Sequence, residues 1–199
     1  MTLSLEYLDA YYQVTRHGTV DPVWDWGGYL EALTKRRDLV DAYSWAVPNE
    51  QALELLGDHA PIFEMGAGTG YWAYEMRRRG IPVEAYDKYP PHRRHNHYHD
   101  KAKKVWTGVL HGRPPKAKRR PRHTLFLSWP PYASPMAYDT LRAYQGDTLI
   151  YIGEGDGGCT GCHQFHRLLD TKWNELEWIS LPKWQGLHDD MRIYRRKGS

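Results

Sequence analysis

Three glycines spaced two residues apart follow a short apolar segment in the first half of the chain. In the stretch PIFEMGAGTGYWAYEM, Glu64 precedes Gly66, Gly68 and Gly70. Glycines at such a turn let the backbone bend sharply, approach a ligand closely and direct the free N–H groups of a helix start towards it. We therefore expect a ligand-binding loop after a strand at residues 61–65. The alternative is a loop that only turns a strand into a helix.

The spacing of these glycines argues against two common nucleotide sites. Dinucleotide loops need G-x-G-x-x-G, whereas Tyr71 occupies the place of the third glycine here. A P-loop needs a Gly-Lys-Ser/Thr sequence, and none follows. NAD, FAD and P-loop nucleotides are therefore disfavoured as ligands.

The E-x-G-x-G-x-G pattern resembles motif I of the class I S-adenosylmethionine (SAM)-dependent methyltransferases, in which the acidic residue and the loop backbone hold the methionine part of the cofactor. Asp87 is similar in position to the acid with which that family binds both ribose hydroxyls. The segment before the loop resembles a helix that packs over the cofactor in many members. The resemblance spans residues 43–194 and implies SAM as the cofactor. The cofactor-binding residues that we predict are Trp45, Pro48, Glu64, Gly66, Gly68, Gly70, Asp87 and Trp129.

The adenine contact is not assigned by this resemblance. Family members often carry an acidic or amide residue after the third strand that meets the adenine amine. Leu110, His111 and Gly112 occupy that region here.

A second motif marks the expected acceptor side. Residues 128–132, Ser-Trp-Pro-Pro-Tyr, resemble the Asp/Asn/Ser-Pro-Pro-Tyr motif of amino-methyltransferases that act on adenine, cytosine or glutamine. Trp129 stands at the place of the polar residue, and strand alternation predicts that Ser128 points to the other face. The Pro130 carbonyl and Tyr132 are retained, so an amine or planar acceptor fits. The alternative is a rigid, proline-fixed exit from the strand.

The catalytic candidates follow two neighbouring segments. Glu154 and Asp156 lie on a glycine-rich loop after residues 148–153, and His166 follows. Ligands bind at the carboxyl ends of strands in an open α/β sheet, so we expect these residues opposite the cofactor's methyl group. We predict that Glu154, Tyr132 or His166 removes or orients a proton of the acceptor. The alternatives are that Glu154 is an exposed acid with no function and that His166 caps a polar contact.

Two segments carry the residue types of metal sites. Cys159, Cys162, His163 and His166 have zinc-like spacing, but a second cysteine pair is lacking. Their C-x-x-C-H core would need export for haem attachment, and the N-terminal residues do not form a signal peptide. The histidine-rich residues 92–100 are typical of a solvated loop. We expect no metal at either segment.

Composition sets the class of protein. The 199 residues are 41% apolar and 26% charged with a net charge of +3, which is typical of a globular chain. No apolar run approaches the roughly 18 residues of a membrane span. Two cysteines do not form a disulfide framework. We expect a cytoplasmic protein that does not enter a membrane.

Hydrophobic periodicity predicts the elements that position these residues. Helices are expected at residues 5–16, 29–43, 50–56, 71–79 and 136–144, and strands at 61–65, 81–86, 104–110, 124–129, 148–153, 176–181 and 191–195. This order predicts an α/β fold with a doubly wound, mainly parallel seven-stranded sheet, a C-terminal antiparallel hairpin and preceding N-terminal helices. We predict one structural domain, with a helical extension at 1–57 that covers the cofactor site and a Rossmann-like core at 58–199.

These observations predict a SAM-dependent methyltransferase that acts on a nitrogen or oxygen of a small-molecule or peptide acceptor. One alternative is a nucleic-acid base methyltransferase, favoured by the Pro-Pro-Tyr ending and by the basic arm between Lys116 and Arg122. The arm is expected to be a solvated connector away from the methyl-transfer site, and no target-recognition domain is present. A second alternative is a SAM-binding module without catalysis. The sequence does not indicate the oligomeric state.

Overall fold

The protein forms a single mixed sheet covered by helices. The computed structural model describes residues 4–15, 25–90, 96, 98–99 and 104–198. Within this part of the chain, seven strands lie in the order β3-β2-β1-β4-β5-β7-β6. Strands β1 to β5 pair in parallel, whereas β7 runs antiparallel to both β5 and β6. The predicted doubly wound, mainly parallel sheet with a terminal antiparallel hairpin is confirmed.

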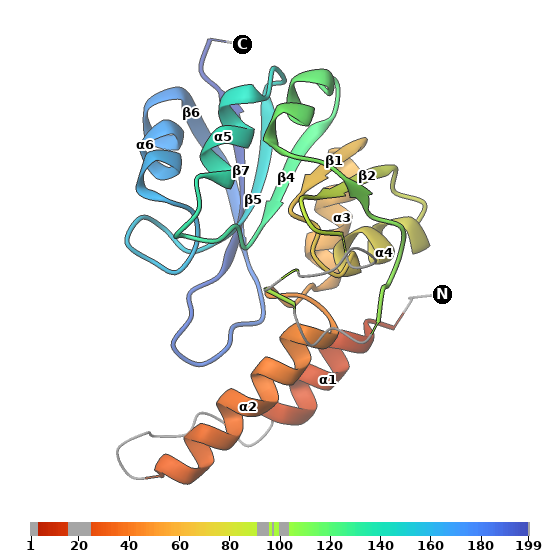
Figure 1. Ribbon diagram of the computed structural model, residues 1–199, viewed down its shortest axis with the longest axis vertical. Helices are drawn as coiled ribbons and strands as arrows, with labels where there is room; N and C mark the ends of the chain where they lie inside the picture. Colours follow the sequence, from red (N-terminus) through yellow and green to blue (C-terminus); the bar gives the residue numbers. More distant parts are fainter. Residues whose placement is uncertain (1–3, 16–24, 91–95, 97, 100–103, 199) are drawn as a thin grey trace.

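Helices alternate with the strands through most of the sheet (Figure 1). The strands are β1 Ile62–Met65, β2 Val83–Asp87, β3 Leu110–His111, β4 Thr124–Ser128, β5 Thr148–Gly153, β6 Trp173–Ser180 and β7 Asp190–Arg196. The helices are α1 Glu6–Thr15, α2 Trp26–Ala42, α3 Glu50–Asp58, α4 Tyr71–Arg78, the 3-10 helix η1 Pro114–Arg119, α5 Met136–Ala143 and α6 His163–Lys172. Among the described residues, no helix has the length and apolar character needed to cross a membrane.

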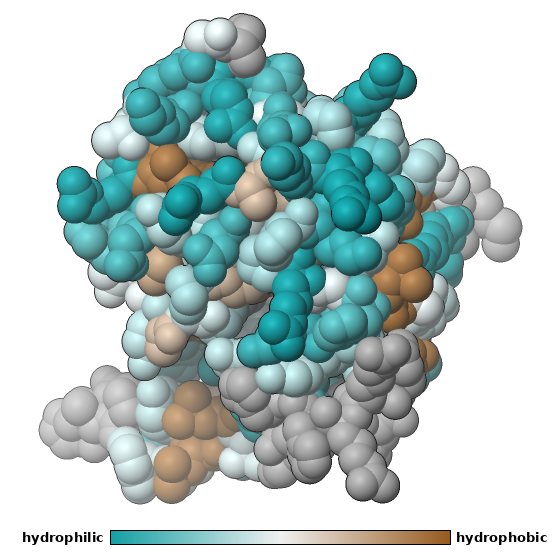
Figure 2. Space-filling view, turned by 45° about the horizontal axis from the view of Figure 1, so that its top comes forward, coloured by the Kyte–Doolittle hydropathy of each residue, from teal (hydrophilic) through white to brown (hydrophobic). Residues whose placement is uncertain are grey.

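Alternating side chains give the sheet two buried faces. In β1, Ile62 packs with α3 and α4 on one face, while Phe63 packs with α5 and α6 on the other. In β4, Phe126 joins the first face, and Leu125 and Leu127 join the second. The central strands are therefore continuous apolar runs, as expected for strands covered on both faces. Most of the surface in Figure 2 is hydrophilic, with hydrophobic residues in separate small patches.

The N-terminal helices α1 and α2 lie beside the sheet (Figure 1), and aromatic side chains attach them there. The rings of Tyr7, Tyr43, Tyr71 and Trp106 contact one another, with centroids 4.7 to 5.8 Å apart. The Tyr7 hydroxyl donates to the Ser44 carbonyl at 3.0 Å, which satisfies its polar end inside the cluster. This cluster holds α1 and α2 on the start of α4. The division of the chain at residue 57 stays a prediction.

The third strand is much shorter than the predicted residues 104–110. Only Leu110 and His111 pair with β2. The amide of Trp106 donates to the Thr69 carbonyl at 3.2 Å, and its ring joins the aromatic cluster. These contacts draw the chain towards α4 and away from the edge of the sheet.

Two segments that the sequence left irregular are helical. The basic arm contains η1, which packs on α5 and β1 with Ala117 fully buried. Its Arg120 forms an ion pair with Glu84, Nη2 to Oε2 at 2.6 Å. Helix α6 packs Phe165 and Leu169, one helical turn apart, against the sheet. The arm is therefore anchored through Ala117 and Arg120, while the side chains of Lys116, Lys118, Arg119 and Arg122 are exposed, as predicted for a solvated connector.

The turn into α4 gives a test of backbone strain. Gly70 caps α4 at φ +78°, and a Cβ there would lie 2.9 Å from Val109 Cγ2 and 3.2 Å from the Thr107 carbonyl oxygen. Gly80 has a φ of +73° with open space around it. We predict that Gly80→Ala lowers the free energy of unfolding by about 1 to 2 kcal/mol and Gly70→Ala by about 2 to 4 kcal/mol. Urea unfolding measures both, and equal losses would contradict the proposed crowding at Gly70.

Candidate functional site

A cavity of about 640 Å³ opens where the central parallel strands end. Its walls include the glycine loop after β1, the end of β2, residues 112–114, residues 128–129 and 131–136 at the end of β4 and after it, and the chain around α2. The volume lies within the range of small-molecule sites, roughly 300 to 1,000 Å³. Ligands of open α/β sheets bind at this edge, so the cavity is the candidate site.

The glycine loop turns β1 into α4 through left-handed backbone conformations. The φ angles are +84° at Gly66, +53° at Gly68 and +78° at Gly70, a region that glycine adopts without steric cost. The amides of Gly66 and Ala67 both donate to the Tyr86 carbonyl, at 2.8 and 3.1 Å. The loop is therefore held against the end of β2.

Two of the three glycines form part of the cavity wall. A Cβ on Gly66 would lie 2.9 Å from Met136 Cε, and one on Gly68 would lie 2.6 Å from His99 Nε2. Both positions line the cavity, so a ligand meets bare backbone there. Gly70, which the sequence assigned to the cofactor, does not line the cavity and caps α4 instead.

Asp87 ends β2 beside this loop. Its Oδ2 accepts a hydrogen bond from the Gly68 amide at 3.0 Å, and its Oδ1 accepts one from the Tyr89 amide at 2.7 Å. Burial raises the pKa of Asp87, although these two hydrogen bonds act to lower it. A carboxylate has about four lone-pair sites, so Asp87 can also accept hydrogen bonds from hydroxyl groups of a ligand.

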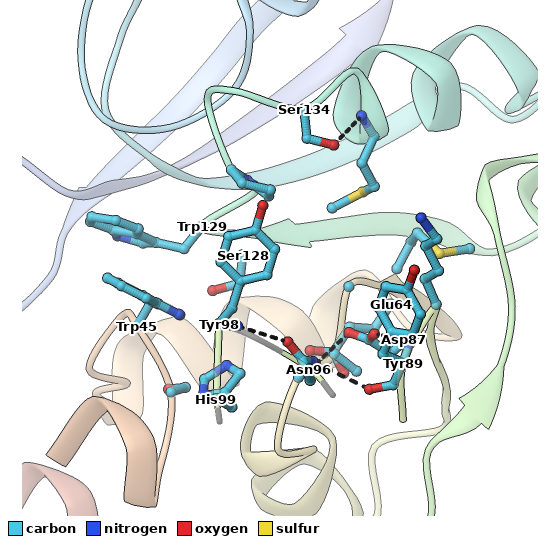
Figure 3. Close-up of a pocket in the computed structure, with 18 of the residues that line it drawn as sticks. Trp45, Glu64, Asp87, Tyr89, Asn96, Tyr98, His99, Ser128, Trp129 and Ser134 are labelled. Carbon is cyan, nitrogen blue, oxygen red and sulfur yellow. Dashed lines mark hydrogen bonds between the residues drawn. The ribbon is translucent and has the colours of Figure 1, made fainter. Parts of the chain in front are cut away.

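Glu64 contributes a buried carboxyl group to the same wall (Figure 3). The residue is only 2% exposed, and its Oε2 has no hydrogen-bond partner among the described residues. Burial raises the pKa of Glu64 to about 8, with Arg77 lowering it and Asp87 raising it further. Because a buried carboxylate is costly without a partner, this position suits a ligand that brings a positive charge.

The opposite end of the cavity is aromatic. Trp45 and Trp129 stack with ring centroids 5.1 Å apart and planes 17° apart (Figure 3). Trp129 has a φ of +50°, an uncommon conformation that costs a bulky residue on the order of 1 to 3 kcal/mol. Both indoles line the cavity, whereas Pro48, which the sequence assigned to the cofactor, is buried outside it.

The Ser-Trp-Pro-Pro-Tyr segment differs in two ways from the sequence-based expectation. Ser128 lines the cavity together with Trp129, because the left-handed conformation at Trp129 breaks the strand alternation. The Pro130 carbonyl, expected to face an amine, accepts a hydrogen bond from the Gly161 amide at 2.8 Å. Tyr132 lines the cavity as predicted and is 63% exposed.

Glu154 and His166 do not line the cavity. Glu154 accepts hydrogen bonds from the amides of Cys159, at 2.7 Å, and His188, at 2.9 Å. Burial acts to raise the pKa of Glu154, but these hydrogen bonds hold it below its usual value. His166 Nε2 hydrogen-bonds to the Thr160 carbonyl at 2.8 Å. As a correction, both side chains hold the loop after β5, which leaves Tyr132 as the predicted catalytic residue at the cavity.

The candidate metal ligands are spread among other contacts. Cys159 lines the cavity, and His163 Nδ1 hydrogen-bonds to Asp156 at 2.9 Å. Nowhere in the described ranges do three His, Cys, Asp or Glu side chains group as metal ligands. His92, His95 and His97 lie outside the described residues.

Several cavity residues were missed by sequence reasoning. Tyr98 and His99 belong to the segment interpreted as a solvated loop, yet both line the cavity (Figure 3). Arg36 reaches the cavity from α2. A charged residue on a helix carries no local signal that distinguishes a cavity position from a solvated one.

No protein-family model and no curated protein sequence matches the chain. Magnesium protoporphyrin IX methyltransferase (ChlM) from Synechocystis PCC 6803, solved with bound SAM, is similar over 96% of this chain and 92% of its own, at 10% identity and a TM-score of 0.49. The 1,6-didemethyltoxoflavin-N1-methyltransferase from Burkholderia thailandensis, solved with S-adenosylhomocysteine (SAH), is similar over 98% and 92%, at 15% identity and a TM-score of 0.49. The N-methyltransferase NodS from Bradyrhizobium japonicum WM9, solved with bound SAH, is similar over 96% of this chain and 99% of its own, at 10% identity and a TM-score of 0.47. At these values the likeness concerns the fold alone, so the cofactor and reaction are inferred from the cavity itself.

Glu64 is expected to make stability depend on pH. Its pKa is about 8 in the folded protein against an ordinary value of 4.5, so the folded state holds the proton more tightly. The free energy of unfolding should therefore fall as pH rises from about 4.5 to about 8, by up to ~1.4 kcal/mol per pH unit. Glu64→Gln, which stays neutral, should be more stable than the wild type at pH 8 and similar to it at pH 5.

Urea unfolding at these two pH values measures the effect. Glu54→Gln is the control, because Glu54 is exposed on α3 and does not line the cavity. A gain for Glu64→Gln that is equal at both pH values would contradict the buried, protonated carboxyl.

Proposed function

We propose that the protein is a SAM-dependent methyltransferase that transfers a methyl group to a nitrogen or oxygen of a small-molecule or peptide acceptor. The observation that carries the proposal is the buried Glu64 carboxyl, whose Oε2 has no partner among the described residues, beside the bare backbone of the glycine loop and the Asp87 carboxylate. SAM carries a positive ammonium group, a positive sulfonium and a ribose with two hydroxyls. These groups match that wall of the cavity in charge and in hydrogen bonding.

The residues present fit this cofactor one by one. Glu64 offers a carboxyl to the cationic part, and Gly66 and Gly68 leave room where a Cβ would meet Met136 or His99. We assign the ribose hydroxyls to the free lone pairs of Asp87. We assign the adenine to the adjoining wall formed by Tyr89 and residues 112–114, which line the cavity beyond Asp87.

The chain's own contribution to catalysis is mainly positioning. When bound, SAM supplies a methyl group already activated by the positive sulfonium. The residues after β4 lie across the cavity from Glu64 and Asp87 (Figure 3), where they can hold an acceptor in line with that methyl group. We infer that the hydroxyls of Ser128 and Tyr132 orient the acceptor's amine or hydroxyl through hydrogen bonds.

The nucleic-acid alternative has less support. None of residues 116–122 lines the cavity, and Arg120 is already paired with Glu84. The Pro130 carbonyl, which would accept a hydrogen bond from the target amine of a base, is engaged by the Gly161 amide. Both features that favoured this alternative in the sequence therefore have structural roles.

Cofactor binding is tested by calorimetry with SAM and SAH, for which we predict micromolar affinity. Asp87→Ala should weaken binding by about 1 to 3 kcal/mol, or about 5- to 150-fold, because charge-assisted hydrogen bonds to the ribose are lost. Asp156→Ala is the matched control, because Asp156 is an exposed acid outside the cavity. Wild-type affinity in the Asp87 variant would place the ribose elsewhere.

Transfer is tested with methyl-labelled SAM and separated small-molecule, protein and nucleic-acid fractions of a source-cell extract. We expect label in the small-molecule fraction or in peptides. Label in nucleic acid alone would favour the base-methyltransferase alternative. Binding of SAM without label in any fraction would favour a non-catalytic module.

A further inference from the structure

Two neighbouring arginines on α2 approach the Trp45–Trp129 pair but differ in their partners. Arg37 lies 5.8 Å from the Trp45 ring centroid and makes two hydrogen bonds to Asp41, at 2.9 and 3.0 Å. Arg36 lies 5.6 Å from the Trp45 centroid and 5.9 Å from the Trp129 centroid, and it lines the cavity. No carboxylate in the described part of the chain forms an ion pair with Arg36, and its Nε is buried without a hydrogen-bond partner. The guanidinium donors of Arg36 are therefore left for a ligand.

One buried acid, Asp189, lies within electrostatic reach of Arg36 but does not pair with it. The residue is 1% exposed, and neither of its carboxyl oxygens has a hydrogen bond of good geometry with a described donor. Burial raises the pKa of Asp189 to about 6, against the lowering effect of the nearby Trp129 indole N–H and of Arg36. Asp189 thus offsets part of the charge of Arg36 and leaves its planar array of donors free. Such an array matches the two oxygens of a carboxylate.

The aromatic pair supplies a flat surface next to this cation. The two indoles stack on each other, and both line the cavity. An aromatic ring that packs on such a surface gains stacking energy beyond its area burial. The carboxyl groups of Glu64 and Asp87 lie at the other end of the cavity (Figure 3). The cavity therefore has an acidic end, and an end that is basic and aromatic.

We propose that the methyl acceptor is a planar aromatic carboxylate, which packs its ring against the Trp45–Trp129 pair and places its carboxylate on Arg36. The proposal rests on the proposed methyltransferase function and names its acceptor class. It makes Arg36 a specificity-determining residue, supplied by the N-terminal helices to the active site of the sheet. The acidic end takes the cationic cofactor, and the basic end takes the anionic acceptor.

The test compares matched acids and neutral amides on the SAH-loaded protein by calorimetry. The probes are benzoate with benzamide and 2-naphthoate with 2-naphthamide, which differ in charge at nearly constant shape. We expect at least one acid to bind, and to bind at least tenfold more tightly than its amide. Arg36→Gln should remove this preference while leaving SAH affinity within about twofold.

Lys35→Gln is the matched control for the variant. It makes the same change of charge on the same turn of α2, but Lys35 is 51% exposed and pairs with Glu31. Its preference for the acids should equal that of the wild type. Because the comparison of acid with amide uses the wild-type protein, the proposal stays testable if Arg36→Gln fails to fold.

Three results would overturn the acceptor assignment: equal binding of acid and amide, binding of neither, or an undiminished preference in Arg36→Gln. These outcomes are separate from failure of the proposed function, which would appear as absence of SAH binding. If SAH does not bind, the same titrations without SAH test whether Arg36 binds carboxylates.

Discussion

The sharp turn from β1 into α4 decides where the other walls of the cavity lie. The backbone can bend there because glycines adopt left-handed conformations, and it stays bent because the amides of Gly66 and Ala67 bind one carbonyl at the end of β2. The Asp87 carboxylate then fixes the next part of the turn through the Gly68 amide. With the loop fixed, Glu64 lies near the end of β1 on the cavity wall, and its Oε2 has no hydrogen-bond partner among the described residues. A local backbone constraint thus creates the acidic wall on which the account of cofactor binding depends.

The two ends of the cavity carry groups of opposite charge. The acidic end lies on strands of the sheet, whereas Arg36 and Trp45 come from the N-terminal helices and the segment after them. The aromatic cluster around Tyr7 and Trp106 holds these helices in place. In a partly desolvated cavity such charges act more strongly than in water. A cationic cofactor and an anionic acceptor would each meet the complementary end, so that the reacting groups are brought together between them.

The sequence predicted the parts of the molecule that depend on local pattern. The central strands have apolar runs, and the glycine loop and Asp87 lie within 24 residues of each other in the chain. It failed where a distant contact decides the outcome. Trp106 leaves the predicted strand to join an aromatic cluster, and Glu154 points to two loop amides instead of the cavity. The position of Glu154 after a predicted strand placed it near the correct edge of the sheet. Its hydrogen-bond partners could be known only from the fold.

The central claim is that the Glu64 carboxyl receives the positive charge of SAM, and proton release on binding tests it most directly. Because burial keeps the pKa of Glu64 at about 8, the free protein holds this proton at pH 7, and a cation beside the group should displace it. Calorimetric titration with SAM in buffers of different ionisation enthalpy measures the number of protons released. The account predicts release of close to one proton by the wild type and none by Glu64→Gln. Binding of SAM with no proton release, or with equal release in the variant, would contradict it.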